Sequence, residues 1–376
     1  MMRNPFIYGE AVTGRDFCDR KREIEKLLND LLDSQKVFLI SSRRMGKTSL
    51  IKVVLKKLNE KGFITIFLDI EGITTYKKFL NLYFNTLIEK FTGMKKVYEF
   101  IKKLLPGIKV ELKIDEYGKP KLSLDYSPRE IENEEIDRKI FSLPEKLSLK
   151  KPVVIAFDEF QEILKLNGGR IEATLCSSIQ HQRRVGYIFA GSKRSLLSHM
   201  VNSLDSPFYR IGPVMYLDKI PEREFAKFIY DKFKKTGIKI KYETVLKIIQ
   251  VADEIPYYVQ MFSHELWDLA VSTRKRILEK DVEAVFTQLI TQYDENFREV
   301  WSRLISSKRQ ILNVIARRGG KNLMSKDTIQ MYELPYPASI QKTLESLIKD
   351  GYIDKVKDEY FIVDILFREW IRRCTI

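Results

Sequence analysis

One stretch, Val37–Leu50, restricts the fold more than any other part of this 376-residue chain. It reads VFLISSRRMGKTSL: a short apolar run, a small polar and basic turn, and then Gly46, Lys47 and Thr48 at the head of an apolar pattern with helical spacing. This order predicts a strand, a phosphate-binding loop and a helix, because backbone N–H groups of such a loop and of the helix N-terminus face a triphosphate. Lys47 would reach the β and γ phosphates, and the Thr48 hydroxyl would join the shell of a Mg²⁺ ion.

The loop departs from the general pattern at its first position. That pattern is G-x-x-x-x-G-K-[ST], and Ser41 stands in place of the first glycine, which tolerates a strained backbone at no steric cost. A chance GKT in a basic chain is the alternative interpretation, but the strand before it and the helix after it favour a phosphate loop. The residues expected to bind nucleotide are Ser42, Arg43, Arg44, Met45, Gly46, Lys47, Thr48 and Ser49.

An acidic pair forms a second chemical landmark. The run Val153–Phe157 is apolar with a β-branched bias, as in a strand buried on both faces, and it ends in Asp158 and Glu159. Acids at the carboxyl end of such a strand lie where open α/β sheets bind ligands. Asp158 would hold Mg²⁺ through water, and Glu159 would polarise the water that attacks the γ-phosphate. The alternative is a helix N-cap followed by an acid in the first turn.

Further apolar runs complete a sheet. They cover 62–69, 186–190 and 214–217, and Ser192 follows the second of these, which places its hydroxyl beside the acidic pair. Five strands joined by helices predict a parallel sheet covered on both faces. Alternation in residues 108–126 predicts a β-hairpin inserted between two core strands. Helical stretches are expected at about 76–103 and at 129–148.

Beyond residue 220 the pattern is helical. Helices are predicted at 221–236, 241–252, 255–271 and 279–297, with Pro256 in the first turn of the third, and together they form a lid-sized domain. The final stretch, about 301–376, reads as three helices and two short strands, which is the order of a winged helix. In a DNA reader, the face of its third helix with Ser339, Gln341, Lys342 and Glu345 would enter the major groove. Winged helices also dock proteins, so both partners stay open.

Composition adds weaker constraints. The chain has 66 Lys and Arg against 51 Asp and Glu, a formal charge of +15, which favours an acidic partner such as nucleic acid but also fits the charged surface of a heat-adapted protein. No apolar run approaches the roughly 18 residues of a membrane span, and the N-terminus lacks a signal-peptide core, so we expect a cytoplasmic protein. The three cysteines and three histidines lack the spacing of a disulfide framework or a metal site.

The N-terminal Phe6 has two interpretations. Its ring would suit stacking over a nucleotide base, or it would pack in the core.

These features together resemble the prokaryotic, archaeal-type P-loop ATPases related to the AAA+ and STAND proteins. The resemblance covers essentially the whole chain and rests on Asn4-Pro5-Phe6, the loop at 41–50, the acidic pair at 157–160 and Ile362-Val363-Asp364. Members commonly carry serine at the first loop position. The resemblance implies an α/β core, an all-helical lid and a winged helix, with ATP and Mg²⁺ roles for Lys47, Thr48, Asp158 and Glu159.

The resemblance also implies further site residues. It suggests Ser192 as the sensor at the end of the fourth strand and Pro256 as the lid-helix proline. Arg210 matches an arginine that in AAA+ proteins often touches the γ-phosphate of a neighbouring subunit, and a surface ion pair is the alternative. The expected catalytic set is therefore Lys47, Glu159, Ser192 and Arg210.

We accordingly expect a core at 1–218, a lid at 219–298 and a winged helix at 299–376. The expected function is a slow, Mg²⁺-dependent ATPase switch whose closed, ATP-bound state binds double-stranded DNA through the winged helix. The alternative is a protein-interaction switch, in which the winged helix docks onto the lid, a partner or another copy of the chain. A small-molecule kinase is disfavoured by the helical and winged C-terminal third.

Overall fold

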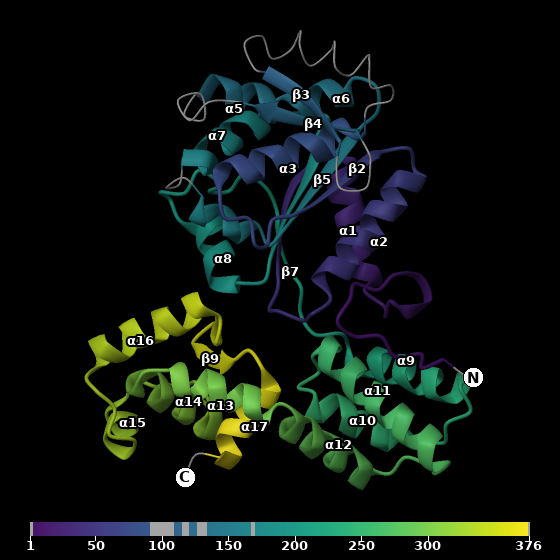
Figure 1. Cartoon of the computed structure of the whole chain (residues 1–376), viewed down its shortest axis with the longest axis vertical. Coiled ribbons are helices and arrows are strands. Elements are labelled where there is room, and N and C mark those ends of the chain that lie inside the picture. The colour runs from purple at the N-terminus through teal and green to yellow at the C-terminus, as the bar shows by residue number, and fades with distance from the viewer. Residues whose placement is uncertain (1–2, 91–108, 115–119, 126–133, 167–169, 375–376) are drawn as a thin grey trace.

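The computed structural model describes residues 3–90, 109–114, 120–125, 134–166 and 170–374. Figure 1 shows three parts: a sheet covered by helices, a helical lid below it, and a winged helix beside the lid. The boundaries expected at 218 and 298 stay predictions. None of the helices in the described ranges is long and apolar enough to cross a membrane.

The central sheet is parallel, as predicted. Its strands are β1 Lys36–Ile40, β2 Ile64–Asp69, β5 Val153–Asp158, β6 Val185–Gly191 and β7 Val214–Tyr216. Their spatial order is β2-β5-β6-β1-β7, and every pairing is parallel. The chain order reverses between β1 and β6, so the carboxyl ends of these two strands mark the place where such sheets bind ligands.

Both faces of the sheet are buried, which explains the unbroken apolar strands. Val37 and Leu39 of β1 pack under one layer, whereas Phe38 and Ile40 pack under the other. The first layer consists of α1 Lys21–Leu32 and α2 Lys47–Glu60. The second consists of α3 Tyr76–Ile88, α5 Glu134–Phe141, α6 Leu143–Ser148, α7 Arg170–Ile179 and α8 Arg194–Asn202.

The insertion after α3 is a hairpin, as predicted. Its strands β3 Lys109–Ile114 and β4 Pro120–Asp125 pair antiparallel. The rest of the helical stretch expected at 76–103, the hairpin tip and residues 126–133 lie outside the described residues.

The lid is helical, as predicted, but one expected helix is interrupted. Its helices are α9 Glu222–Lys235, α10 Tyr242–Val251, α11 Pro256–Thr273 and α12 Glu279–Gln292. The single helix expected at 279–297 was wrong, because Tyr293 leaves helical geometry with φ −96° and ψ 6°. A new helix, α13, then starts at Asp294 and runs to Arg303. Asp294 and Glu295 suit a helix start, since carboxylates are favourable in a first turn.

The C-terminal part is a winged helix, as predicted. It contains α14 Ser306–Arg318, α15 Lys326–Met331, α16 Pro337–Asp350, β8 Ile353–Val356 and β9 Glu359–Ile362, followed by α17 Ile365–Cys374. β8 and β9 pair antiparallel as the wing. Helix α17 was not expected from the sequence, and it buries Phe367 and Trp370.

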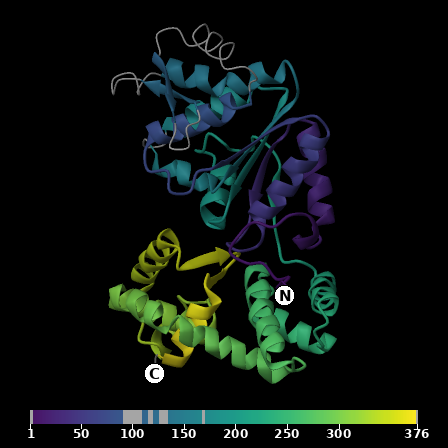
Figure 2. The ribbon, with the colours of Figure 1, turned by 45° about the vertical axis from the view of Figure 1, so that its right-hand side comes forward.

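The apolar core consists of three clusters of buried side chains. Two clusters flank the sheet, whereas a third runs without interruption through the lid and the winged helix. Figure 2 shows the helices of these last two parts side by side below the sheet. The N-terminal segment reaches the same third cluster, because Phe6 is 1% exposed and packs against Phe233 of α9. Packing in a core was therefore the right interpretation of Phe6.

Candidate nucleotide-binding site

A cleft of about 570 Å³ opens at the carboxyl ends of β1, β5 and β6. The N-terminal segment and the start of α11 close its other sides. The predicted site residues that line it are Ser42, Arg43, Arg44, Met45, Gly46, Lys47, Thr48, Ser49, Glu159, Ser192 and Pro256. Asp158 lies just beneath the cleft, and Arg210 lies outside it. Eleven of the predicted residues thus meet in one place.

The phosphate loop accommodates serine at its first position without strain there. The backbone of Ser41 stays outside the left-handed region, which is adopted instead by Arg44 at φ 67° and Gly46 at φ 84°. The Ser41 N–H donates to the Gly191 carbonyl at 3.3 Å, which joins the loop to β6. Helix α2 begins at Lys47, so its free N–H groups face the cleft.

Lys47 lies between two carboxylates. Its Nζ forms ion pairs with Asp158 and, at 2.8 Å, with Oε1 of Glu159. The Thr48 hydroxyl donates to the second oxygen of Asp158 at 2.5 Å. Lys47 and Asp158 are buried, so the pair is shielded from water. The residues expected to hold phosphate and metal therefore contact one another, with opposite charges paired.

The oxygens Thr48 Oγ1 and Asp158 Oδ2 fit Mg²⁺. Mg²⁺ prefers oxygen ligands and, at nucleotide sites, uses one or two protein ligands together with phosphate oxygens and water. Within the described ranges, no group of three or more His, Cys, Asp or Glu side chains could hold a metal. A Mg²⁺ site here therefore depends on the nucleotide for its remaining ligands.

Glu159 is held from two sides. Its backbone adopts φ 53° at the end of β5. Its Oε2 accepts hydrogen bonds from the Ser192 hydroxyl at 2.6 Å, the Ser192 N–H at 3.3 Å and Gln161 Nε2 at 2.5 Å. Burial by itself would raise the pKa of Glu159, but Lys47, Ser192 and Gln161 outweigh it and lower the pKa to about 2. The side chain is therefore a carboxylate at neutral pH.

The remaining wall of the cleft is apolar and aromatic. It is formed by Tyr8 and Phe17 of the N-terminal region, by Ile220 and Phe225 around the start of α9, and by Tyr257 of α11. Such a wall suits the flat ring of a base, with the phosphates directed toward α2. The Ser49 hydroxyl accepts a hydrogen bond from the Val12 N–H at 3.0 Å, so it secures the N-terminal segment to α2.

Comparison with known proteins agrees with this geometry. Residues 17–262 match a family described as "ATPase domain predominantly from Archaea". The chain belongs to this archaeal ATPase family. Residues 295–373 match a second family, described as "Probable winged helix domain". A search of curated proteins found no significant match.

Solved structures share the whole fold of this ATPase. A Walker-type ATPase of Pyrococcus abyssi is 19% identical with a TM-score of 0.66, covering 98% of this chain and 99% of that one. The ORC2 protein of Aeropyrum pernix, solved in ADPNP and ADP complexes, is 16% identical with a TM-score of 0.59, covering 98% and 96%. The ORC1 protein of Aeropyrum pernix, solved with DNA, is 12% identical with a TM-score of 0.51, covering 94% and 92%. At these identities the likeness is one of fold, and it confirms the predicted archaeal-type architecture.

Arg210 of this ATPase does not line the cleft. It is exposed, and its guanidinium lies 5.0 Å from the ring centroid of the neighbouring Tyr209. Its action on a neighbouring subunit therefore stays a prediction.

Sequence reasoning missed the aromatic wall of the cleft and also Gln161 and Arg20, which hold other residues of the site in place. Gln161 contacts Glu159 as described above. Arg20 is 3% exposed and donates to the Asp218 carbonyl at 2.6 Å and to the Met45 carbonyl at 3.3 Å, which joins the phosphate loop to the segment after β7. No signal in the sequence pointed to Gln161, because it stands between Phe160 and Glu162 in a stretch of mixed polarity. For Arg20 there was also none, because both of its carbonyl partners are distant in sequence.

Arg44 connects the cleft of the ATPase to its other two parts. Its guanidinium lies 4.6 Å and 4.8 Å from the ring centroids of Tyr257 and Tyr258 in the lid. It also pairs with Asp364 of the winged helix at 3.1 Å. One side chain of the phosphate loop thus contacts both the lid and the winged helix.

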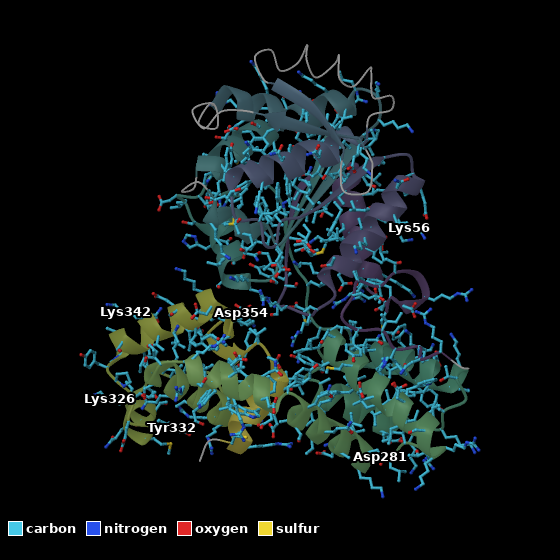
Figure 3. The ribbon with its side chains drawn as sticks, in the orientation of Figure 1. Lys56, Asp281, Lys326, Tyr332, Lys342 and Asp354 are labelled. Carbon is cyan, nitrogen blue, oxygen red and sulfur yellow. The ribbon has the colours of Figure 1, made fainter. Side chains whose placement is uncertain are left out.

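A second contact links the segment after β6 to the winged helix. Lys193 Nζ donates to the Lys349 carbonyl at the end of α16, at 3.3 Å. Asp354 of β8 faces the core (Figure 3) and lies with Arg43 and Lys193 around a small cavity. Burial raises the pKa of Asp354 to about 6. The backbone N–H groups of Lys355 and Arg194 and the positive charges of Arg194 and Arg43 oppose this shift, because they favour the charged form.

Proposed function

We propose that this ATPase hydrolyses ATP slowly with Mg²⁺ and that the bound nucleotide sets the position of its winged helix, which binds double-stranded DNA. The phosphate loop, the acidic pair and the family match support the hydrolysis. The contacts of Arg44 support the coupling.

The residues can carry out the reaction as follows. When ATP enters, Lys47 exchanges its carboxylate partners for the β and γ phosphates, which frees Oε1 of Glu159. Thr48 and Asp158 would hold Mg²⁺, which neutralises phosphate charge when bound. Glu159 Oε1 accepts a proton from water as the water oxygen bonds to the γ-phosphorus, and the bond from that phosphorus to the β–γ bridging oxygen breaks. ADP and inorganic phosphate are the products.

The observation that carries the coupling is the shared use of Arg44. Nucleotide phosphates in the loop would attract Arg43 and Arg44, which face Asp354 and Asp364 of the winged helix. Nucleotide binding would therefore change the free energies of the docked and undocked positions of the winged helix by different amounts. Such a difference is the condition for a population shift.

Glu159→Gln and Lys47→Ala test the hydrolytic site. Glu159→Gln removes the proton acceptor, so it should bind ATP and retain it with turnover lost. Lys47→Ala removes the phosphate contact, so it should lose ATP binding. ATP affinity by calorimetry and phosphate release measure the two effects, and normal turnover by Glu159→Gln would refute the assignment.

Three observations favour DNA as the partner. The outer face of α16 exposes Gln341 and Lys342, and Figure 3 shows Lys342 on that helix. The chain has a charge of +15, and phosphate contacts by basic side chains release counterions. A protein of similar fold has been solved with DNA.

Protein docking is the second candidate, because β8 and the end of α16 already contact the core. ATP turnover with and without double-stranded DNA, at two salt concentrations, separates the two. Stimulation that fades at high salt and is lost in Lys342→Glu supports DNA. Lys280→Glu on the exposed face of α12 is the matched control and should respond normally. Turnover indifferent to DNA at both salt concentrations favours protein docking.

A further inference from the structure

We infer that Gln161 is a positioning residue for hydrolysis: with Ser192 it holds Oε2 of Glu159, so that Oε1 faces the nucleotide when Lys47 leaves. This inference rests on the proposed role of Glu159. It assigns a function to a residue that contacts neither phosphate nor metal in that scheme.

The geometry divides the partners of the Glu159 carboxylate between its two oxygens. Lys47 contacts Oε1 at 2.8 Å, whereas Gln161 and the Ser192 hydroxyl contact Oε2 at 2.5 Å and 2.6 Å. A triphosphate attracts the ammonium of Lys47 more strongly than it attracts a neutral amide or hydroxyl. The two contacts on Oε2 therefore persist after ATP binds, and the oxygen vacated by Lys47 becomes the proton acceptor.

Gln161 is held in place for this contact. It is 1% exposed in the short helix η2 Phe160–Lys165, whose Phe160 and Ile163 are buried beside it. Its own Oε1 is buried and has no hydrogen-bond partner. A buried amide with an unpaired carbonyl is unfavourable. We therefore attribute the position of Gln161 to the hydrogen bond that its Nε2 donates to Glu159.

Gly191 makes room for the Gln161 amide. A Cβ on residue 191 would lie 2.2 Å from Gln161 Oε1 and 3.1 Å from Leu197 Cδ2. Because the amide is the movable end of a side chain, alanine at this position would displace Gln161 from Glu159. Gly191 precedes Ser192, so one short segment sets both contacts to Oε2.

The test compares Gln161→Leu and Gly191→Ala with the wild type in steady-state ATP turnover and in direct ATP binding. Each variant should lower kcat about tenfold, the effect expected for one hydrogen bond to a charged group, with KM and ATP affinity unchanged. Combining either variant with Ser192→Ala should cost less than the product of the single effects, because both donors act on one oxygen. A purely structural defect would instead lower kcat and ATP binding together.

Gln182→Leu is the matched control. Gln182 is also buried, but its Nε2 donates to the Phe141 carbonyl and its Oε1 accepts from Tyr187, away from the cleft. It should lose stability without a selective loss of kcat. If Gln161→Leu does not fold, Gly191→Ala still decides the question.

The outcomes separate this inference from the proposed function. Normal kcat in Gln161→Leu or in Gly191→Ala overturns the inference if Glu159→Gln is inactive. If Glu159→Gln retains full turnover, the proposed function itself fails.

Discussion

At the residue scale, Lys47 has two successive tasks. It is the counterion of Asp158 and Glu159, and with nucleotide it would become a phosphate ligand. Two carboxylates at a buried site repel each other unless a cation lies between them. The lysine that we propose as a phosphate ligand therefore also has a structural role as a counterion.

Lys47→Met tests this structural task. It keeps the length of the side chain but leaves Asp158 and Glu159 without their cation, so the free energy of unfolding of the ligand-free protein should fall by about 3–5 kcal/mol. Urea unfolding measures the change. The added substitution Asp158→Asn should restore part of the loss, and a Lys47→Met variant as stable as the wild type would contradict the assignment.

Arg44 combines backbone strain with three favourable contacts. Its φ of 67° is costly for a residue with a Cβ. Arg44→Ala would keep the strain and lose the contacts to Tyr257, Tyr258 and Asp364, whereas Arg44→Gly would lose the contacts and the strain together. We expect Arg44→Gly to be more stable than Arg44→Ala by about 1 kcal/mol in urea unfolding. Equal stabilities would show that residue 44 is not left-handed in solution.

At the scale of elements, the start of α8 depends on the winged helix. The N-cap residue Lys193 makes no side-chain cap. Asp354 of β8 faces this end, and the Arg194 backbone N–H favours its carboxylate. A strand of one domain thus places a hydrogen-bond acceptor at the start of a helix of another.

Docking of the winged helix should weaken as pH rises. The docked Asp354 has its pKa raised from 3.8 to about 6, despite Arg43 and Arg194 beside it, and Lys193 borders the same cavity. A raised pKa means that the neutral form is favoured on docking, so this contribution is complete below about pH 4 and is lost as pH rises through about 6. Energy transfer between fluorophores on α3 and α15 measures docking. Asp354→Asn should remove the dependence, and a persistent slope in that variant would assign it elsewhere.

The sequence was sufficient to predict the sheet, the first three lid helices and the phosphate side of the cleft, but not α17 or the aromatic wall of the cleft. The apolar runs located the five strands, and the loop and acidic pair located Lys47, Thr48, Asp158 and Glu159. It was not sufficient for the break at Tyr293, because both sides of that residue continue a helical pattern. It also could not reveal Arg44 with Asp364, because partners 320 residues apart leave no local periodicity.

At the scale of the whole molecule, the contact between the lid and the winged helix differs in chemistry from the contact between the winged helix and the sheet domain. The lid and the winged helix share one apolar cluster, and Arg368 of α17 adds an ion pair with Asp253 of the lid. The winged helix meets the sheet domain through Arg44, Lys193 and Asp354, which are polar or charged contacts. The lid and winged helix should therefore move as one body against the sheet domain.

Asp364→Asn tests this division. Asparagine retains the acceptor for the Leu366 and Phe367 N–H groups at the start of α17 but loses the charge that pairs with Arg44. We expect a larger radius of gyration by X-ray scattering, and high salt should expand the wild type in the same way. Asp253→Asn is the control, because its joint retains the apolar cluster. Expansion of that variant instead would place the flexible joint elsewhere.

The N-terminal segment has a mechanical consequence. It is fixed to the lid by Phe6 and to α2 by the Val12 N–H, and the chain crosses the same joint again between Leu217 and Pro221. Two chain crossings would act as a hinge and would restrict rotation of the lid against the sheet domain to one axis. The cleft lies beside that axis, whereas α15 lies at the outer side of the winged helix (Figure 1). A small closure around a nucleotide would thus move α15 over a longer path, because displacement in a rotation grows with distance from the axis.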